Sequence, residues 1–304
     1  SVTRLAAPGS AVQLTSTAGD VTFAAGVGAG SDAAPLGSFV VNAGSIALND
    51  VVTLGPQTYT ATGEGGAVTL GGSYRTSGGG FTTNGPVVLA RAGEPVLVDT
   101  TGTGEGGAIT FNGRVDGATA GGNDLTLRPG AGAVTFAGNV GEAVPLGTVR
   151  VESSLALAAP EVEADPGLED QPTPLSVILT QGAPAAEPEL VVAGVPDGFA
   201  LTDGTNRCVG TACDGRNIVG WALGQLRLEA PADLGGVSVP LAFELSGRVP
   251  NLGELPAVFQ VAQLLARSTS PTATATVTIA AVADAPVVSA GNVSGRPGET
   301  IPLR

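Results

Sequence analysis

Residues 1–157 repeat one short phrase, in which Val-Thr or Ile-Thr is followed by Phe or Leu and flanked by small residues. The copies run over 20–28, 66–72, 107–113 and 132–141. Within a copy, apolar residues alternate with threonine, so that Ile109 and Phe111 share one face and Thr110 takes the other. This period of two is typical of a strand with one buried face. Glycine and asparagine between the copies favour turns that need a positive φ.

Strand–turn units at intervals of about 20 residues predict the coils of a parallel β-solenoid over 1–157. Each coil would bury its inward row against the coils above and below, and we expect Phe111 and Phe136 in that row. A β-sandwich of hairpins is the competing architecture. Only two Asn-Gly pairs occur in this region, beginning at Asn84 and Asn112. Because Asn-Gly is the strongest signal for a two-residue hairpin, the solenoid is favoured.

The composition favours an all-β protein without nucleic acid or membrane partners. The 47 glycines and 22 prolines disfavour helix interiors. The formal net charge is −14 and the sequence contains neither Lys nor His, whereas nucleic acids and anionic membranes attract basic patches. No apolar run approaches the roughly 20 residues that span a bilayer, so we expect no membrane insertion.

We do not expect an enzyme. Solenoids that cleave polysaccharides need a groove with paired carboxylates or a basic catalyst. The acids that come nearest to such a cluster are Asp99, Glu105, Asp116 and Asp124. Without any His or Lys, the usual general bases and activators of nucleophiles are missing.

Cys208 and Cys213 are the only cysteines, and Gly210 lies between them. This spacing can close a tight disulfide-bonded loop. Such a bond would contribute about 2 kcal/mol by the loop-entropy estimate and would place the protein in an oxidising compartment. Two free thiols are the alternative, since no further Cys or His could complete a zinc site.

The composition changes after residue 157. Residues 158–174 are rich in acids and prolines and indicate a linker or domain edge. Candidate strands then follow at 175–180, 189–195, 220–231, 237–249 and 272–282. Turn signals every 8–15 residues or so predict an immunoglobulin-like β-sandwich over 158–284. Residues 254–267 are the best helix candidate, with a strand plus a loop as the alternative.

A junction occurs twice. Ala159-Pro160 and Ala285-Pro286 each open a short apolar stretch, a turn that contains glycine and an acid, and a Pro-Leu strand. A junction that recurs after about one domain length indicates tandem modules. Residues 285–304 are too few for a domain, so we expect the start of a further module or a strand donated to a neighbour.

Several motifs of the second half occur in a familiar order. They are "VVAGVPDGFALTDGT" at 191–205, "WAL" at 221–223, "LRLEAPADLGGVSV" at 226–239 and "ATATVTIAAVADAP" at 273–286. With them, the segment 160–286 resembles the immunoglobulin/cadherin-like repeat of giant bacterial surface adhesins. The first half is similar to the β-helical repeats of filamentous-haemagglutinin-like proteins. The chain departs from the adhesin pattern in its cysteine loop and in lacking the acid-rich loop and the RTX nonapeptides of such proteins.

The resemblance implies calcium at module junctions, where acidic residues serve as ligands. Calcium takes six to eight oxygen ligands, many of them from carboxylates. The acids at the two junctions are Asp165, Glu169, Asp170, Asp284 and Glu299. Ordinary solvated turn acids are the alternative. The acids near the cysteine loop, Asp197, Asp203 and Asp214, suggest a cation or glycan site, or simply a loop tip held by the disulfide.

Two functions are compatible with these features. The first is a non-enzymatic structural or adhesive segment of a large bacterial surface protein, a stiff spacer in adhesion or biofilm matrix outside the cell. Its partners would be neighbouring modules of the same protein and a surface glycan or protein receptor. The second is a subunit of an extracellular filament or sheath that polymerises by donating residues 285–304 as a strand.

Overall fold

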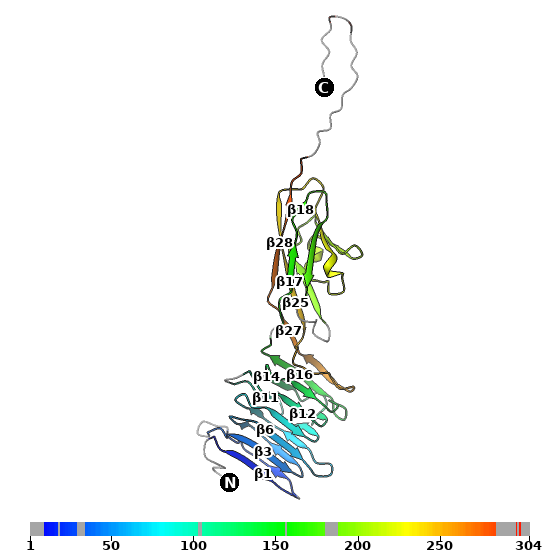
Figure 1. The fold of residues 1–304 in the computed structure, drawn as a ribbon. Coiled ribbons are helices and arrows are strands. Elements are labelled where there is room, and N and C mark those ends of the chain that lie inside the picture. Colours follow the sequence, from blue (N-terminus) through cyan, green and yellow to red (C-terminus); the bar gives the residue numbers. More distant parts are fainter. Residues whose placement is uncertain are drawn as a thin grey trace.

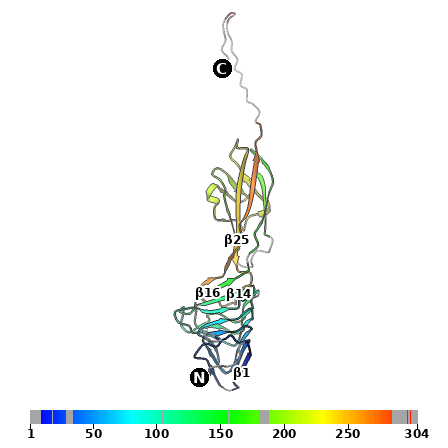
Figure 2. The same cartoon turned by 90° about the vertical axis from the view of Figure 1, so that its left-hand side faces the viewer.

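The computed structural model describes residues 9–17, 19–28, 34–102, 105–155, 157–179 and 188–283, with Arg296 and Gly298. Strands dominate, and the described helices are two short 3₁₀ turns, η1 (Gly210–Cys213) and η2 (Leu223–Gln225). No helix in the described part is long and apolar enough to cross a bilayer. Figures 1 and 2 show two units placed end to end, a stack of short strands and a second unit with longer strands.

The N-terminal unit is a parallel β-solenoid with three sheets. The first sheet contains β1 (Ala11–Thr15), β3 (Ser38–Ala43), β6 (Gln57–Ala61), β9 (Phe81–Asn84), β12 (Ile109–Phe111) and β15 (Val134–Phe136). The second contains β2 (Val21–Thr22), β4 (Ile46–Leu48), β7 (Val68–Leu70), β10 (Val87–Leu89) and β13 (Val115–Gly117). The third contains β5 (Val51–Val52), β8 (Ser73–Arg75), β11 (Val96–Asp99), β14 (Leu125–Gly130), β16 (Leu146–Ser153) and β26 (Val261–Leu265). The predicted all-β fold and solenoid are confirmed.

The inward side of the solenoid is filled by a continuous row of aromatic rings. In order along the stack, this aromatic row is Phe23, Phe39, Tyr59, Phe81, Phe111, Phe136 and Phe259. Successive ring centroids lie 5.2 to 6.1 Å apart. Alternating apolar and polar residues, as at Ile109, Thr110 and Phe111, produce this row because each inward side chain meets the next coil. Truncating such a buried ring to alanine costs about 3–5 kcal/mol.

The side chain of Gln57 is a buried polar group that is hydrogen-bonded within this core. The Nε2 atom of buried Gln57 donates to the Arg75 carbonyl oxygen at 2.9 Å and to Thr53 Oγ1 at 3.2 Å. The Tyr59 hydroxyl donates to Gln57 Oε1 at 3.0 Å. Burial, and secondarily the neighbouring Tyr74, raise the pKa of Tyr59 well above its usual value. Buried polar groups are tolerated when they are paired in this way.

Close contact between coils explains the glycine content of the corners. A Cβ atom added at Gly107 would collide with the backbone of Gly79, and one at Gly132 would collide with the backbone of Gly107. These three glycines lie one above another in successive coils. A side chain there would push the coils apart, so only glycine lets the strands keep their ladder.

The second unit consists of two sheets. One contains β17 (Glu161–Ala164), β19 (Thr173–Ile178), β24 (Leu226–Glu229), β21 (Ala200–Thr202) and β22 (Arg207–Val209), all antiparallel. The other contains β18 (Gly167–Leu168), β28 (Ala273–Ala280), β25 (Val237–Arg248), β20 (Glu189–Ala193) and β23 (Arg216–Asn217), with β27 (Arg267–Thr269) paired to β25. Side chains of both sheets, such as Leu228 and Phe243, form one hydrophobic core.

The helix expected at 254–267 is wrong. This segment contains β26, which pairs in parallel with β16, so the alternative of a strand plus a loop is correct. Val258, Val261, Leu264 and Leu265 match a helical period, but the open edge of the solenoid offers them a sheet partner. Tertiary contact overrides the weak local preference of so short a segment.

Candidate functional site at the junction of the two units

A long loop of the second unit completes the solenoid. After β25 the chain leaves the second unit at Val249, crosses the end of the stack, and returns at Ala266 before β27. We call residues 249–266 the capping loop. Leu252 bridges to Val134 of the first sheet, Phe259 bridges to Val140, and β26 extends the third sheet. The last coil of the solenoid is therefore distant in sequence from the coils below it.

Backbone hydrogen bonds hold the capping loop on the stack. The Val134 amide donates to the Asn251 carbonyl at 2.8 Å, and the Gly253 amide donates back to Val134 at 2.9 Å. Similarly, the Val140 amide donates to Val258 at 2.9 Å. These bonds continue the ladders of the coils and give backbone groups of Val134 and Val140 partners in the loop.

Side chains of the capping loop cover the end of the solenoid's hydrophobic core. Phe259 adds the last ring of the aromatic row, with its centroid 5.8 Å from that of Phe136. Leu252 is buried beside it. The Asn251 Nδ2 atom donates to the carbonyl oxygens of Gly132 at 2.6 Å and Gly130 at 3.2 Å. The loop thus closes both the apolar core and the polar corner of the solenoid.

The base of the capping loop is fixed to the second unit. Strands β25 and β27 pair from Ser246–Thr269 to Arg248–Arg267, and the Val249 amide donates to Ala266 at 2.8 Å. The Arg267 guanidinium lies 3.0 Å from the Glu189 carboxylate on β20. Because the loop is anchored at both ends, a rotation of one unit against the other must break sheet hydrogen bonds.

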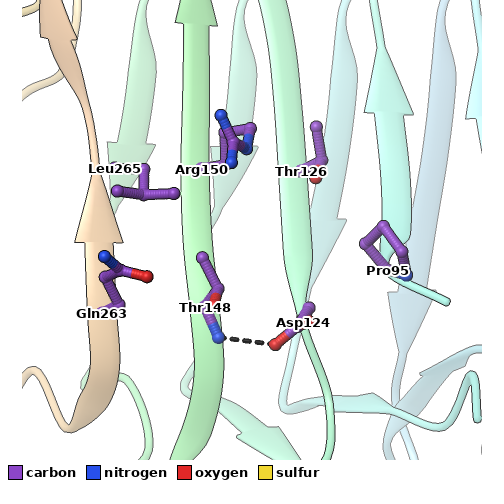
Figure 3. Close-up of a pocket in the computed structure, with 7 residues that line it drawn as sticks. All are labelled: Pro95, Asp124, Thr126, Thr148, Arg150, Gln263 and Leu265. Carbon is purple, nitrogen blue, oxygen red and sulfur yellow. Dashed lines mark hydrogen bonds between the residues drawn. The ribbon is translucent and has the colours of Figure 1, made fainter. Parts of the chain in front are cut away.

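A shallow hollow of about 250 Å³ lies on the outer face of the third sheet beside this junction (Figure 3). Its lining residues are Pro95, Asp124, Thr126, Thr148, Arg150, Gln263 and Leu265. Asp124 is the single carboxylate among them, and its Oδ1 accepts a hydrogen bond from the Thr148 amide at 2.6 Å. A glycosidase needs two carboxylates across the scissile bond, and this hollow does not provide them.

Charges alternate along the same outer face. Arg75, Asp99 and Arg128 face one another in register on β8, β11 and β14, and Arg128 Nε lies 2.6 Å from Glu152 Oε2 on β16. Ion pairs this exposed contribute at most about 1 kcal/mol each. Their alternation lets neighbouring coils stack without repulsion between like charges.

The predicted disulfide between Cys208 and Cys213 is present, and both cysteine side chains are buried. Of the acids expected near it, Asp203 accepts hydrogen bonds from the amides of Asn206 at 2.6 Å and Ala222 at 2.9 Å. Hydrogen bonds from Asn206 above all hold the pKa of Asp203 well below its usual range. Its carboxylate therefore fixes the β21–β22 turn.

The other acids and the tryptophan near this loop also have local partners. Asp214 Oδ1 accepts a hydrogen bond from the Gly194 amide at 2.9 Å. The Asp197 carboxylate lies against the backbone of Gly210. The Trp221 ring packs partly buried on the core, with the Arg216 guanidinium 5.7 Å from its centroid. These contacts hold the loop in shape.

The acids expected at calcium sites fall in different places. Glu169 is buried, and its Oε1 accepts a hydrogen bond from the Val282 amide. Asp170 Oδ1 accepts one from the Asp233 amide at 3.1 Å, whereas Asp165 is exposed. Asp284 and Glu299 lie outside the described residues. In the described part of the chain, no three acids, histidines or cysteines converge as a metal site would need.

Sequence reasoning missed the capping residues, although one signal was available. Phe259, Gln260 and Val261 repeat the apolar–polar–apolar pattern of the solenoid strands. Compared with known proteins, the chain matches no family model, no curated protein and no solved structure.

Proposed function

We propose that this chain is a non-enzymatic spacer segment of a large modular protein on the surface of a bacterium. The observation that carries the proposal is the capping loop. Units within one chain normally move against each other unless their interface is large and apolar. Here the sheet and the aromatic row of one unit continue into a loop of the other, which favours a single stiff rod.

The strand order supports an immunoglobulin-like assignment for the second unit. In immunoglobulin domains one sheet has the order ABED and the other contains C, F and G. Strands β17, β19, β24 and β21 follow the first order, and β28, β25 and β20 follow the order GFC. The short β18 pairs in parallel with β28, as the second half of a split first strand would. On this assignment the capping loop is a long F–G loop.

The disulfide and the surface chemistry support an extracellular location for this spacer. The Cys208–Cys213 bond persists best in an oxidising compartment. The net charge of −14 keeps such rods soluble and mutually repelling. The adhesin-like motifs of 191–286 agree with a role in cell adhesion or matrix, where the receptor is a surface glycan or protein.

Calcium at the distal junction is part of this proposal. Glu169, Asp170 and Val282 lie together at the end of the second unit that leads to Asp284. EDTA should lower the melting temperature of the second unit, because an ion that binds only the folded state stabilises it. An unchanged melting curve after metal removal would take calcium out of the proposal.

Small-angle X-ray scattering tests the spacer role. In the test variant, residues 250–265 are replaced by a Gly-Ser segment of equal length, and Glu254→Ala, an exposed change in the same loop, is the matched control. The wild type and the control should scatter as one rod, and the variant should show a broadened distribution of distances between the units. Identical scattering from all three would contradict the proposal.

A filament subunit is the second candidate. Strands β1 and β2 are end strands of their sheets, at the end of the solenoid opposite to the second unit (Figure 1). Such open edges can accept an added strand. If residues 285–304 of another copy supply it, the purified chain should form regular fibres, and deletion of 287–304 should abolish them. A chain that stays monomeric at high concentration would reject this candidate.

A further inference from the structure

The outward face of the first solenoid sheet carries a grid in which most side chains end in hydroxyl or amide groups. Its middle column, in register along the stack, contains Gln13, Val40, Thr58, Thr82, Thr110 and Thr135. The adjacent column, two residues further along each strand, contains Thr15, Asn42, Thr60, Asn84 and Asn112. We call these two columns the threonine face.

The side chains of the threonine face are held in place. Asn112 Nδ2 donates to Asn84 Oδ1 at 2.8 Å, and Asn84 Nδ2 donates to Thr60 Oγ1 at 3.0 Å. The β-branched threonines have few allowed rotamers. Directly behind the sheet, the aromatic row fixes the backbone, with Phe81 and Phe111 fully buried. The grid is therefore rigid before any ligand arrives.

The middle column offers free hydroxyl groups. Within the described residues, the hydroxyls of Thr58, Thr82, Thr110 and Thr135 have no hydrogen-bond partner, and all four side chains reach the surface. Each threonine presents a hydroxyl and a methyl group side by side.

The threonine face is uncharged on a strongly acidic chain. None of its positions holds an acid or an arginine, although the formal net charge is −14. By contrast, the outward face of the third sheet alternates Arg75, Asp99 and Arg128. A neutral, rigid and regular face suits a neutral ligand with a repeat of its own.

The grid repeats in two directions, so an ordered ligand can match it. Neighbouring strands lie about 4.7–4.9 Å apart, and residues two apart on a strand lie about 6.6 Å apart. The first spacing is close to the repeat of hexagonal ice along its a axis. Water held on such a grid loses little further entropy when it joins the lattice. We propose that the threonine face binds the surface of ice.

Two other occupants fit the face less well. A second copy of the chain would bury roughly 300 Å² on this grid, below the about 800 Å² per partner of a stable complex. A glycan chain would follow one column and usually stacks on exposed aromatic rings. The aromatic side chains of the described solenoid face inward, and Phe39, Tyr59 and Phe81 are fully buried.

The test is thermal hysteresis and inhibition of ice recrystallisation by the purified full chain. Thr110→Lys places a charge in the centre of the grid, and Thr110→Val removes one hydroxyl while keeping the shape. Thr69→Lys is the matched control, because Thr69 faces outward from the second sheet between Ala47 and Val88. Circular dichroism melting shows that each variant is folded.

We expect activity in the wild type and in Thr69→Lys, a loss in Thr110→Lys and a reduction in Thr110→Val. A wild type without hysteresis would overturn the proposal, even if the chain binds a polysaccharide or itself. An equal loss of thermal hysteresis in Thr69→Lys and Thr110→Lys would also overturn the proposal, because ice binding would then not depend on the threonine face. The spacer role does not depend on this result, since scattering reports on the capping loop alone.

Discussion

At the scale of single residues, Thr83 places an unpaired hydroxyl group in the core of the solenoid. Its side chain is fully buried between Tyr59 and Phe111 in the same inward column, and its Oγ1 has no hydrogen-bond partner among the described residues. A buried hydroxyl without a partner costs roughly 1–3 kcal/mol. The register nevertheless requires a small side chain there, because aromatic rings occupy both neighbours.

Thr83→Val should therefore stabilise the protein. Valine has the same shape and removes the unpaired hydroxyl, so we expect an increase of about 1 kcal/mol in the free energy of unfolding. Urea titration followed by fluorescence measures it. The matched control is Thr82→Val, which changes an outward-facing neighbour and should leave stability nearly unchanged. A loss of stability in Thr83→Val would show that the hydroxyl does find a partner.

Asp203 links the stability of the second unit to pH. Hydrogen bonds from Asn206, Ala222 and Thr205 lower its pKa in the folded state, whereas the unfolded value is about 3.9. A lowered pKa in the folded state adds stability that is present above the unfolded pKa and is lost as the pH falls below it. The difference in melting temperature between the wild type and Asp203→Ala should be largest near neutral pH and shrink below about pH 4.

The matched control for this pH dependence is Asp165→Ala. Asp165 is exposed, and no hydrogen bond to its carboxylate is found in the described part of the chain. Its melting temperature should stay parallel to that of the wild type across the pH range. A difference for Asp203→Ala that is constant with pH would mean that the lost contacts are not those of the ionised carboxylate.

At the scale of elements, stacked glycines decide whether coils can meet at their corners. Gly107→Ala should lower the free energy of unfolding by about 1–3 kcal/mol, because the new Cβ has only rigid backbone of Gly79 to push against. Gly220→Ala is the control, since no heavy atom lies within 4 Å of its added Cβ. Equal melting temperatures for both variants would show that the coils adjust freely.

The local sequence pattern predicts those strands whose sheet partners lie in the next coil along the chain. Alternation at Ile109, Thr110 and Phe111 is enough to specify a strand, since the neighbouring coils carry the same pattern at short range. The disulfide also followed from local spacing. For 254–267 the local pattern leaves a helix and a strand plus a loop both open, because the partner that decides for the strand, β16, lies about a hundred residues earlier. Whether the acids expected to bind calcium converge likewise depends on loops that meet only after folding.

At the scale of the whole molecule, the capping loop couples the two units, so we expect them to move and to unfold together. In stacked repeat proteins each coil is stabilised by its neighbours, and the terminal coil needs a cap. Here the cap is covalently part of the second unit through β25 and β27. We therefore expect the two units to unfold in one transition. Two units joined only by a linker would instead unfold in two separate transitions.

Phe259→Ala measures this sharing in the full chain. It removes the last ring of the aromatic row, so hydrogen exchange should accelerate at the amides of Val134 and Val140, which donate to the capping loop. The β25–β27 pairing should exchange faster as well, because it loses the loop's anchorage on the stack. Leu168→Ala, an exposed apolar residue at the far end of the second unit, is the control. Faster exchange confined to the solenoid amides would show that the loop is a passive lid, and the stiff-rod account would then fail at its central joint.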